Sequence, residues 1–393
     1  MSTAKIVDLF AGPGGLDVAA DRLGVPVVGI EWDKDACRTR RAAGLPTIEG
    51  DVRNFRPSVQ QRPAVEDELR TELAHVRTAN VLAGGPPCQT YTVAGTGAGR
   101  RALDHVLKLV KRMSDRDETV RLDILGEDER TGLVLEPLRW ALEAIDEKRP
   151  YDAIVLEQVP AALKVWEAMK EALEGEKCYE VVTGILRTEQ YGVPQTRRRA
   201  VLIARRKELA AFEPRPRHFD DISELVRPTH RPYRKGTHRE EGDPNLLPWV
   251  TMEHALNRRG PYVVVSNYGT GGDPKARGRR LSSLPSATVT GKVSRNRVTT
   301  LDGTDLGRFS ESEAGQLQTF PADYPWSGRA IAQQIGNAIP PRLGIHILAA
   351  ALSIDNEARD LALSSLDKDT RLGVQPEASV PEAGPVCYQP ELA

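Results

Sequence analysis

The chain of 393 residues is 40% hydrophobic, which is enough apolar material for a substantial core and for two domains of unequal size. No apolar run reaches the ~20 residues that span a bilayer, and no secretory signal opens the sequence. We therefore expect a cytoplasmic protein without membrane contact. The four cysteines form no C-x-x-C pair, which predicts neither a metal site nor a disulfide framework.

Charge is distributed unevenly along the chain, although its net value is only −1. Residues 195–300 carry 22 basic and 10 acidic side chains, whereas the rest of the chain carries 32 basic and 45 acidic side chains. Arginine-rich loops can simply be solvated, but so many arginines in one segment favour a polyanionic partner. The arginines behind this prediction are Arg197, Arg198, Arg199, Arg205, Arg206, Arg277, Arg279 and Arg280.

Short β-branched runs alternate with helical patterns in the first third of the chain, which predicts an α/β fold with a mostly parallel sheet. Residues 5–10 are typical of a buried strand, 11–15 of a glycine turn and 16–24 of a helix. The other expected strands are 27–33, 80–85, 152–159, 180–187 and 199–206.

Three stretches depart from this alternation. Residues 100–130 are highly charged but contain apolar residues at helical spacing, which favours a surface helix. Those apolar residues are Leu103, Leu107, Val110 and Met113. Turn signals dominate residues 207–280 and predict a small separate domain. The tail from 356 to 393 is polar and rich in proline, so we expect it to be disordered.

The turn "AGPGG" at 11–15 joins a strand to a helix, where main-chain N–H groups meet a ligand and glycine allows its close approach. Glu31 ends the next strand, where a carboxylate can accept hydrogen bonds from ribose hydroxyls. Together they predict an adenosine-type cofactor, and the lack of G-x-G-x-x-G argues against a nicotinamide dehydrogenase. Trp32 is either core or an aromatic face for adenine, and Asp51 is either a turn residue or an acceptor for the adenine amino group.

Cys88 follows two glycines and two prolines in "GGPPCQTYT", directly after an expected strand. Ligands bind beyond such strand ends in open α/β sheets, and the fixed φ of the prolines gives the thiol a defined position. The motif by itself fits an inert buried cysteine, a redox thiol or a nucleophile, and the inert cysteine is the commonest of the three.

Glu157 closes the apolar strand "AIVL", so burial would raise its pKa and suit it to donating a proton. A salt-bridged glutamate at a strand end explains the same residue equally well. Arg197 and Arg199 lie two apart on an expected strand and therefore point the same way, so they could bind a carbonyl oxygen or a phosphate.

Eight blocks, in order, resemble the motif series of the DNA (cytosine-5)-methyltransferases. They are "DLFAGPGGL", "GIEWD", "EGDV", "GGPPCQTYT", "LEQVPA", "YGVPQTRRRAVLIA", "RFSESEAGQLQTFPADYPW" and "QQIGNAIPPRL". The resemblance covers most of the chain from 5 to about 350, apart from the insert at 100–130 and the variable stretch at 207–280. It implies a Rossmann-like methyltransferase domain that uses S-adenosylmethionine, built from residues 1–206 and 325–355, with a small target-recognition domain at 207–324.

The resemblance also implies roles for individual residues. The cofactor contacts would be Phe10, Gly12, Gly14, Gly15, Glu31, Trp32, Asp51, Val52 and Asn337. Glu31 would hold the ribose, Trp32 and Asp51 the adenine, and Asn337 the methionine end. Cys88 would add to carbon 6 of cytosine while Glu157 supplies a proton at ring nitrogen 3. Arg199, helped by Arg197, would fix the base carbonyl.

The substrate implied is duplex DNA, from which the target base must be flipped at a cost of a few kcal/mol. Glycines after Cys88 suit a loop that closes over that base. The family usually has Asn where this chain has Gln158, which leaves the support of the neighbouring loop open. A monomer is expected, with a restriction endonuclease as a possible partner.

Two other functions stay open at this point. One branch of the family methylates tRNA with the same blocks, although the separate basic module at 207–280 favours duplex DNA. A non-catalytic DNA-binding protein of the same fold is the other, and the intact catalytic set argues against it. That set is Cys88, Glu157, Arg197 and Arg199.

Overall fold

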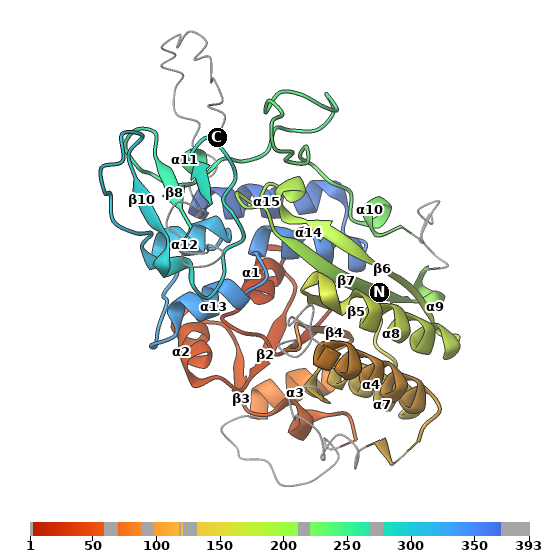
Figure 1. The fold of residues 1–393 in the computed structure, drawn as a ribbon. Coiled ribbons are helices and arrows are strands. Elements are labelled where there is room, and N and C mark those ends of the chain that lie inside the picture. The colour runs from red at the N-terminus through yellow and green to blue at the C-terminus, as the bar shows by residue number, and fades with distance from the viewer. Residues whose placement is uncertain are drawn as a thin grey trace.

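A seven-stranded sheet with the strand order β3-β2-β1-β4-β5-β7-β6 forms the centre of the molecule (Figure 1). The computed structural model describes residues 3–58, 70–87, 97–117, 119–120, 132–210, 221–266 and 278–370. The strands are β1 (Ile6–Leu9), β2 (Val27–Glu31), β3 (Thr47–Glu49), β4 (Val81–Gly84), β5 (Ala153–Gln158), β6 (Tyr179–Arg187) and β7 (Arg198–Arg206). Every strand expected from the sequence is confirmed, with ends that differ by at most two residues.

The strand directions create one edge suited to ligand binding. Neighbouring strands from β3 through β5 run parallel, whereas β7 is antiparallel to both β5 and β6. The chain leaves β1 toward β2 on one side and later returns to β4 on the other, so β1 and β4 flank the topological switch point. Ligands of open α/β sheets bind at the carboxyl ends of strands beside such a point.

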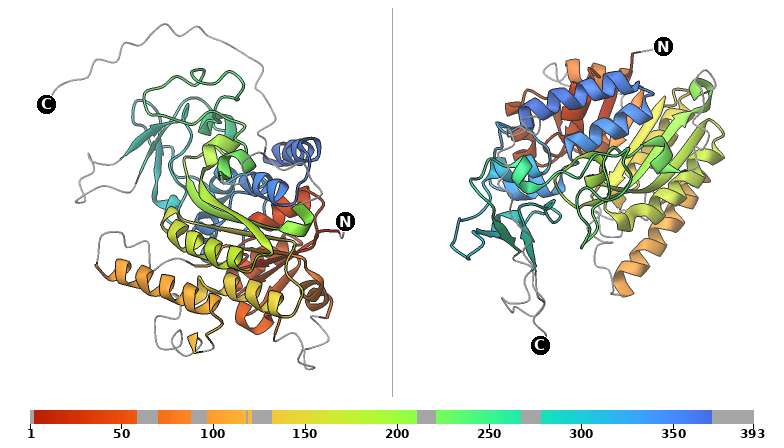
Figure 2. Two further views of the ribbon diagram at one scale, coloured as in Figure 1. Left: turned by 90° about the vertical axis from the view of Figure 1, so that its right-hand side faces the viewer. Right: turned by 90° about the horizontal axis from the view of Figure 1, so that it is seen from above.

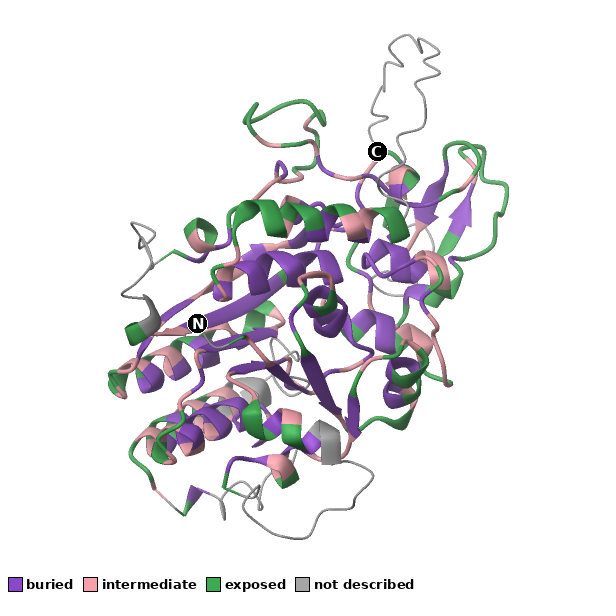
Figure 3. Cartoon of the chain, turned by 180° about the vertical axis from the view of Figure 1, so that it is seen from behind, coloured by how far each residue is buried: buried purple, intermediate pink, exposed green. Residues whose placement is uncertain are grey.

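Helices cover both faces of the sheet (Figure 2). One face carries α3 (Arg70–Thr78), α4 (Gly97–Ser114), α7 (Glu136–Asp146) and α8 (Leu163–Gly175). The other carries α1 (Gly15–Arg22), α14 (Pro341–Ala351), α15 (Asn356–Thr370) and the short α10 (Ile222–Leu225). At the edges, α2 (Lys34–Ala42) packs beside β3, and α9 (Lys207–Ala210) follows β7. The strands are therefore buried on both sides, which explains their nearly continuous apolar sequences (Figure 3).

The helix expected within residues 100–130 is confirmed by α4. Its apolar residues Val106, Val110 and Met113 are buried against the core on the α7 and α8 side of the sheet. The helix thus belongs to the layer that covers the sheet, and Asp104, Lys108 and Lys111 on it are exposed. Residues 121–131 lie outside the described part of the chain.

A smaller unit packs beside the main sheet and has its own core. Its three-stranded antiparallel sheet has the order β10-β8-β9, formed by β8 (Val263–Val265), β9 (Arg279–Leu281) and β10 (Arg297–Thr299). Its helices are α11 (Met252–Ala255) and α12 (Glu311–Leu317), and α13 (Ile331–Asn337), on the segment that returns to the large unit, packs against α12. The core includes Met252, Tyr262, Val298, Phe309 and Ile335. Because Ile335 belongs to this core, the chain is already in contact with the small unit as it returns to the large one.

The expectation of disorder from residue 356 onward is wrong for residues 356–370, which form α15. Leu366 on α15 is fully buried, Asp367 pairs with Arg342, and Asp369 pairs with Arg22 at 2.5 Å. Although α15 is polar in composition, it has an apolar stripe that packs against the core. The charged residues beside this stripe form ion pairs with arginines on α1 and α14. Residues 371–393 lie outside the described part of the chain.

Candidate active site

The glycine turn after β1 and the carboxylate at the end of β2 are joined by hydrogen bonds. The N–H of Gly12 donates to Glu31 Oε2 at 2.7 Å, and Glu31 Oε1 accepts from the N–H groups of Trp32 at 2.8 Å and Asp33 at 2.7 Å. Burial raises the pKa of Glu31, and these N–H donors oppose the shift. The carboxylate is therefore held in one orientation at the edge where the sequence places a ribose ligand.

The glycine turn packs tightly against the segment that returns from the small unit. A Cβ on Gly15 would lie only 2.0 Å from the carbonyl oxygen of Ile339, so only glycine fits there. Tyr324 donates its hydroxyl to the carbonyl of Pro13 at 2.5 Å. Phe10, which precedes the turn, adopts a left-handed backbone with φ of 58° and is partly exposed. The glycine turn is therefore packed on one side against the segment that returns from the small unit.

The residues expected to contact adenine lie at the same edge. Trp32 is 70% exposed, which excludes the core alternative and leaves an aromatic face beside Glu31. Asp51 caps the short helix η1 (Val52–Phe55) by accepting from the N–H of Arg53 at 2.8 Å. Burial would raise the pKa of Asp51, but its hydrogen bonds with Arg53 outweigh burial and lower it. Val52 is buried behind this carboxylate.

A buried charge cluster beneath the glycine turn was not anticipated from the sequence. Arg40 on α2 donates to both carboxylate oxygens of Asp17 on α1, at 2.8 and 2.6 Å, and neither side chain is exposed. Burial raises the pKa of Asp8 on β1, and the Asp17 charge adds to that effect. Because Asp17 lies in the first turn of α1, the pair fixes the helix that follows the glycine turn. The sequence indicated this cluster only through charged residues, Asp17 and Arg40, at positions that face the core on α1 and α2.

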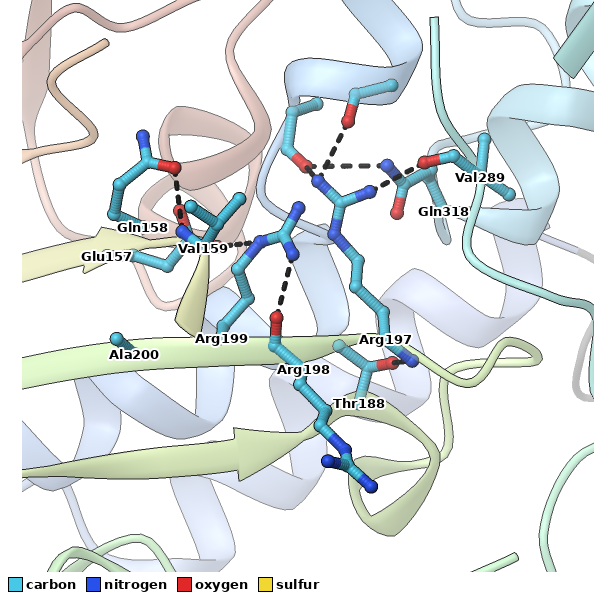
Figure 4. Close-up of polar contacts among 12 residues, drawn as sticks. Glu157, Gln158, Val159, Thr188, Arg197, Arg198, Arg199, Ala200, Val289 and Gln318 are labelled. Carbon is cyan, nitrogen blue, oxygen red and sulfur yellow. Dashed lines mark hydrogen bonds and ion pairs between the residues drawn. The ribbon is translucent and has the colours of Figure 1, made fainter. Parts of the chain in front are cut away.

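Glu157 and Arg199 form an ion pair at the ends of β5 and β7, with Arg199 Nε 2.5 Å from Glu157 Oε1 (Figure 4). Both side chains are buried. Burial raises the pKa of Glu157, in the direction expected from its strand, and the Arg199 charge opposes that shift. Burial in turn lowers the pKa of Arg199, and Glu157 counteracts it.

The end of β4 lies directly beside Glu157. A Cβ on Gly85 would be 3.8 Å from Glu157 Oε2, in ordinary van der Waals contact. The described chain continues through Pro86 and Pro87, and Cys88, the expected nucleophile, lies outside the described residues. The structure therefore brings the proline segment before the thiol to the expected proton donor.

Gln158 supports this proline segment. Its Nε2 donates to the carbonyl of Pro86 at 2.7 Å, while its Oε1 accepts from the N–H of Val159 at 2.7 Å. The methylene that distinguishes it from the usual asparagine is thus accommodated, and both ends of the amide are used. Gln158 therefore supports the neighbouring segment through these two hydrogen bonds, which the sequence alone left open.

Arg197 lies on the same side of the chain as Arg199, as expected, but its partners differ from those expected (Figure 4). Its Nη1 donates to the carbonyl of Val289 at 2.7 Å, and its Nη2 donates to the carbonyls of Gly336 at 2.8 Å and Ala338 at 3.3 Å. Only 2% of the residue is exposed. This guanidinium therefore joins segments of the protein and does not approach Glu157.

Asn337 is exposed at the end of α13, between the two carbonyls that Arg197 binds on the returning segment. Its Oδ1 accepts from Gln333 Nε2 at 2.9 Å. The next residues lead to Ile339, whose carbonyl touches the glycine turn. The expected ligand of the methionine end is thus placed beside the turn by main-chain packing.

Comparison with known protein families identifies the family of this chain. The sequence model of the C-5 cytosine-specific DNA methylases matches residues 4–108 and 126–353. The chain belongs to this family. It transfers a methyl group from S-adenosylmethionine to carbon 5 of cytosine in DNA. Between the two matched parts, residues 109–125 are unmatched, a shorter stretch than the insert expected at 100–130.

Curated relatives match this chain in sequence over most of their lengths. The chain is 26% identical to the type II methyltransferase M.Sau96I of Staphylococcus aureus, covering 87% of this chain and 74% of the relative. It is also 26% identical to M1.HphI of Haemophilus parahaemolyticus, covering 89% and 87%. The solved DNMT2 structure of Spodoptera frugiperda superposes with a TM-score of 0.54 at 14% identity, covering 89% of this chain and 99% of that one.

The residues of this methylase fit S-adenosylmethionine. The turn at 11–15 allows close approach, the oriented Glu31 carboxylate suits ribose hydroxyls, and the exposed Trp32 offers a face for adenine. Among the described residues no group of three histidine, cysteine or acidic side chains is arranged to hold a metal ion. No helix in the same part of the chain is long and apolar enough to cross a membrane.

Several arginines that the sequence associated with a polyanion have internal partners in this methylase. Arg205 donates to the carbonyl of Ala350, and Arg206 pairs with Asp152 at 3.1 Å. Arg280 donates to Thr196 Oγ1 at 2.9 Å. Exposed cations on the small unit include Arg279, Lys292 and Arg295. A count of charges along the sequence therefore overstated the charge that faces a ligand.

Proposed function

We propose that the methylase acts on a cytosine flipped from duplex DNA, through a covalent bond between Cys88 and carbon 6 of the base. The observation that carries this mechanism is the buried Glu157–Arg199 pair beside the Gly85–Pro86 segment. A titratable carboxyl with a raised pKa is a suitable proton donor, and it lies at the strand end that leads to the thiol.

The side chains divide the reaction between them. The Cys88 thiolate forms a bond to carbon 6, while Glu157 gives a proton to ring nitrogen 3, so that electron density reaches carbon 5. Arg199 holds the carboxyl through Nε and has a further guanidinium nitrogen for the base carbonyl. S-adenosylmethionine supplies the methyl group that carbon 5 takes up. Loss of the carbon 5 proton, for which water can serve as the base, then expels the thiolate, and return of the nitrogen 3 proton to Glu157 leaves the neutral aromatic base.

On the cofactor side, we assign contacts to the residues that the sequence indicated. Glu31 binds the ribose, Trp32 stacks on adenine, and Asp51 accepts from its amino group. Asn337 contacts the methionine end. The remaining contacts are Phe10, Gly12, Gly14, Gly15 and Val52. The shared sheet edge of the turn, Glu31 and Trp32 supports this assignment.

We further propose that residues 207–324 recognise the DNA sequence, while residues 1–206 and 325–355 catalyse the reaction. The separate core and the exposed cations of the small unit support this division. The type II methyltransferases among the relatives support a place in restriction and modification, with a partner endonuclease. We expect a monomer that acts on DNA in the cytoplasm.

Trapping with DNA that contains 5-fluorocytosine tests the mechanism, because fluorine cannot leave as a proton and the adduct persists. We expect a covalent adduct with the wild type and with Cys178→Ser, a matched control at a partly buried thiol. Cys88→Ser should form none. An adduct that survives Cys88→Ser would contradict the assigned nucleophile.

The substrate is tested by comparing methyl incorporation into duplex DNA and into tRNA, with bisulfite sequencing of DNA from an expressing host to identify the target. We expect incorporation into duplex DNA at a short, defined site. Incorporation into tRNA alone would overturn duplex DNA as the substrate.

A further inference from the structure

Arg197 belongs to a buried polar junction, defined here as the side chains of Gln195, Arg197 and Gln318. The exposed fractions of these residues are 0%, 2% and 0%. Gln195 Nε2 donates to Gln318 Oε1 at 2.6 Å and to the carbonyl of Leu317 at 3.0 Å, while its Oε1 accepts from the N–H of Val289 at 2.9 Å. The junction thus joins the segment before β7, the small unit and the segment that returns from it.

The junction also holds the main chain on both sides of Asn337. Arg197 binds the carbonyls of Gly336 and Ala338 with one nitrogen and the carbonyl of Val289 with another. Hydrogen bonds to a charged group are stronger than those between neutral groups. One buried guanidinium therefore ties the small unit to the peptide groups that carry Asn337.

Two close backbone contacts complete the connection. A Cβ on Gly336 would lie 2.2 Å from the nitrogen of Gly291 in the small unit, so the two main chains touch with no space for a side chain. Two residues beyond Asn337, the carbonyl of Ile339 meets the cofactor turn at Gly15. The segment 335–339 is in contact with the small unit at one end and with the cofactor turn at the other. A displacement at either end is transmitted through it, because packed main chains do not compress.

We propose that Arg197 is a positioning residue that couples DNA binding to cofactor binding. This inference rests on the proposed function, which takes Asn337 as a cofactor ligand and the small unit as the DNA-binding part. DNA that fixes the small unit also fixes the Val289 carbonyl and, through Arg197, the placement of Asn337. Cofactor bound at Asn337 stabilises the same arrangement from the other side, so each ligand raises the affinity for the other by the same factor.

The test measures binding without methyl transfer, using S-adenosylhomocysteine and a short duplex that carries the site identified by bisulfite sequencing. Titration calorimetry gives the DNA Kd with and without saturating S-adenosylhomocysteine. For the wild type we expect the Kd to fall by about fivefold or more, the lower range of allosteric coupling. Arg197→Lys keeps the charge but cannot reach all three carbonyls, so the coupling should fall to about twofold or less.

Arg198→Lys is the matched control, because Arg198 is the next residue, begins β7 and has an exposed side chain. We expect this variant to keep the wild-type coupling. In steady-state kinetics, Arg197→Lys should raise KM for S-adenosylmethionine by about tenfold while changing kcat less, as expected for lost ground-state binding. A general loss of folded protein would lower the active fraction and leave KM unchanged.

Gln318→Met provides a second variant, which removes the donor to the carbonyl of Ile335 at 2.7 Å and keeps a similar volume. It should also weaken the coupling. Absence of coupling in the wild type would overturn the proposal, even if both variants failed to fold. Unchanged coupling in a folded Arg197→Lys protein would overturn it as well. Failure of the proposed mechanism is distinguishable, because it would abolish the Cys88 adduct while both ligands could still bind cooperatively.

Discussion

Arg199 and Arg197 lie two residues apart and point to the same side of the chain, yet they serve two different regions of the molecule. Arg199 meets a single titratable partner, Glu157, at the edge where the base is expected. Arg197 meets three neutral carbonyls in the buried junction. The first region keeps an ionisable carboxyl in a buried site. In the second region, the guanidinium of Arg197 serves only as a hydrogen-bond donor.

The difference shows how a buried charge can be interpreted. A buried ion pair costs several kcal/mol of desolvation per ion, so it contributes little net stability, and a perturbed carboxyl in such a place points to chemistry. A guanidinium with neutral carbonyl partners satisfies groups that would otherwise be buried without donors. Mutations should therefore affect catalysis in the first region and stability or coupling in the second.

The largest expected effect is on catalysis in the first region. Glu157→Gln keeps the shape of the side chain but cannot supply the proton, so we expect kcat to fall by about 10²–10⁴-fold. Single-turnover methylation would measure this. Glu189→Gln is a suitable control, because Glu189 is also a buried carboxyl with a pKa raised by burial but lies outside the proposed site. A loss in Glu157→Gln below about tenfold would argue against general-acid catalysis.

The next effect should appear as a loss of stability in the second region. Arg197→Met removes the Arg197 donor from the carbonyls of Val289 and Gly336, and it removes one of the two side-chain donors to the carbonyl of Ala338. We expect the free energy of unfolding to fall by about 3 kcal/mol. Arg198→Met, at the adjacent exposed residue that begins β7, should change it by less than about 0.5 kcal/mol. Equal urea midpoints for the two variants would remove the distinction between the regions.

The pH dependence of the unfolding free energy tests the first region, because Glu157 is the titratable group that distinguishes it from the junction around Arg197. The folded protein raises the pKa of this carboxyl above its ordinary 4.5, so the folded state binds the proton more tightly than the unfolded state. The stabilisation is present below the ordinary pKa and is lost as pH rises through the raised pKa. The unfolding free energy of the wild type should thus decline relative to Glu157→Gln from about pH 4.5 upward and then level off. A difference that grows toward low pH in favour of Glu157→Gln would contradict the raised pKa.

The smallest effect should come from the proline segment before Cys88. Gln158→Asn restores the usual family residue but is one methylene shorter than the side chain that now reaches the carbonyl of Pro86. Loss of that hydrogen bond, worth about 1 kcal/mol, should lower kcat about fivefold. DNA affinity should stay unchanged, as measured by fluorescence anisotropy. Wild-type kcat in Gln158→Asn would show that the hydrogen bond to Pro86 does not support catalysis.

The features that were predicted best from the sequence are those that depend only on residues close to one another in the chain. The strand at 152–159, the turn at 11–15 and the carboxylate at Glu31 follow from local apolar runs and glycines, and the structure has them in the expected places. The common direction of Arg197 and Arg199 also agrees with their spacing, although Arg197 lies just before β7 and not on a strand as predicted. The exposure of Trp32 was open, since burial depends on what packs above the residue.

The partners of buried polar groups could not be predicted in the same way. Arg197 bonds to residues 92 and 139 positions away, and Arg40 finds Asp17 across two helices. The helix α15 was missed because its few apolar residues gain stability only against α1 and α14. Such contacts depend on which segments the folded chain brings together, and composition carries no record of them.

By itself, the sequence determined the sheet, the glycine turn and the family, since strand periodicity and motif order are local features of the chain. Only the tertiary structure decided that Arg199 faces Glu157 while Arg197 ties the small unit to the segment of Asn337. The physical reason is that a buried charge takes whatever partner the packing of distant segments brings within hydrogen-bonding distance, and two arginines with the same local surroundings received different partners.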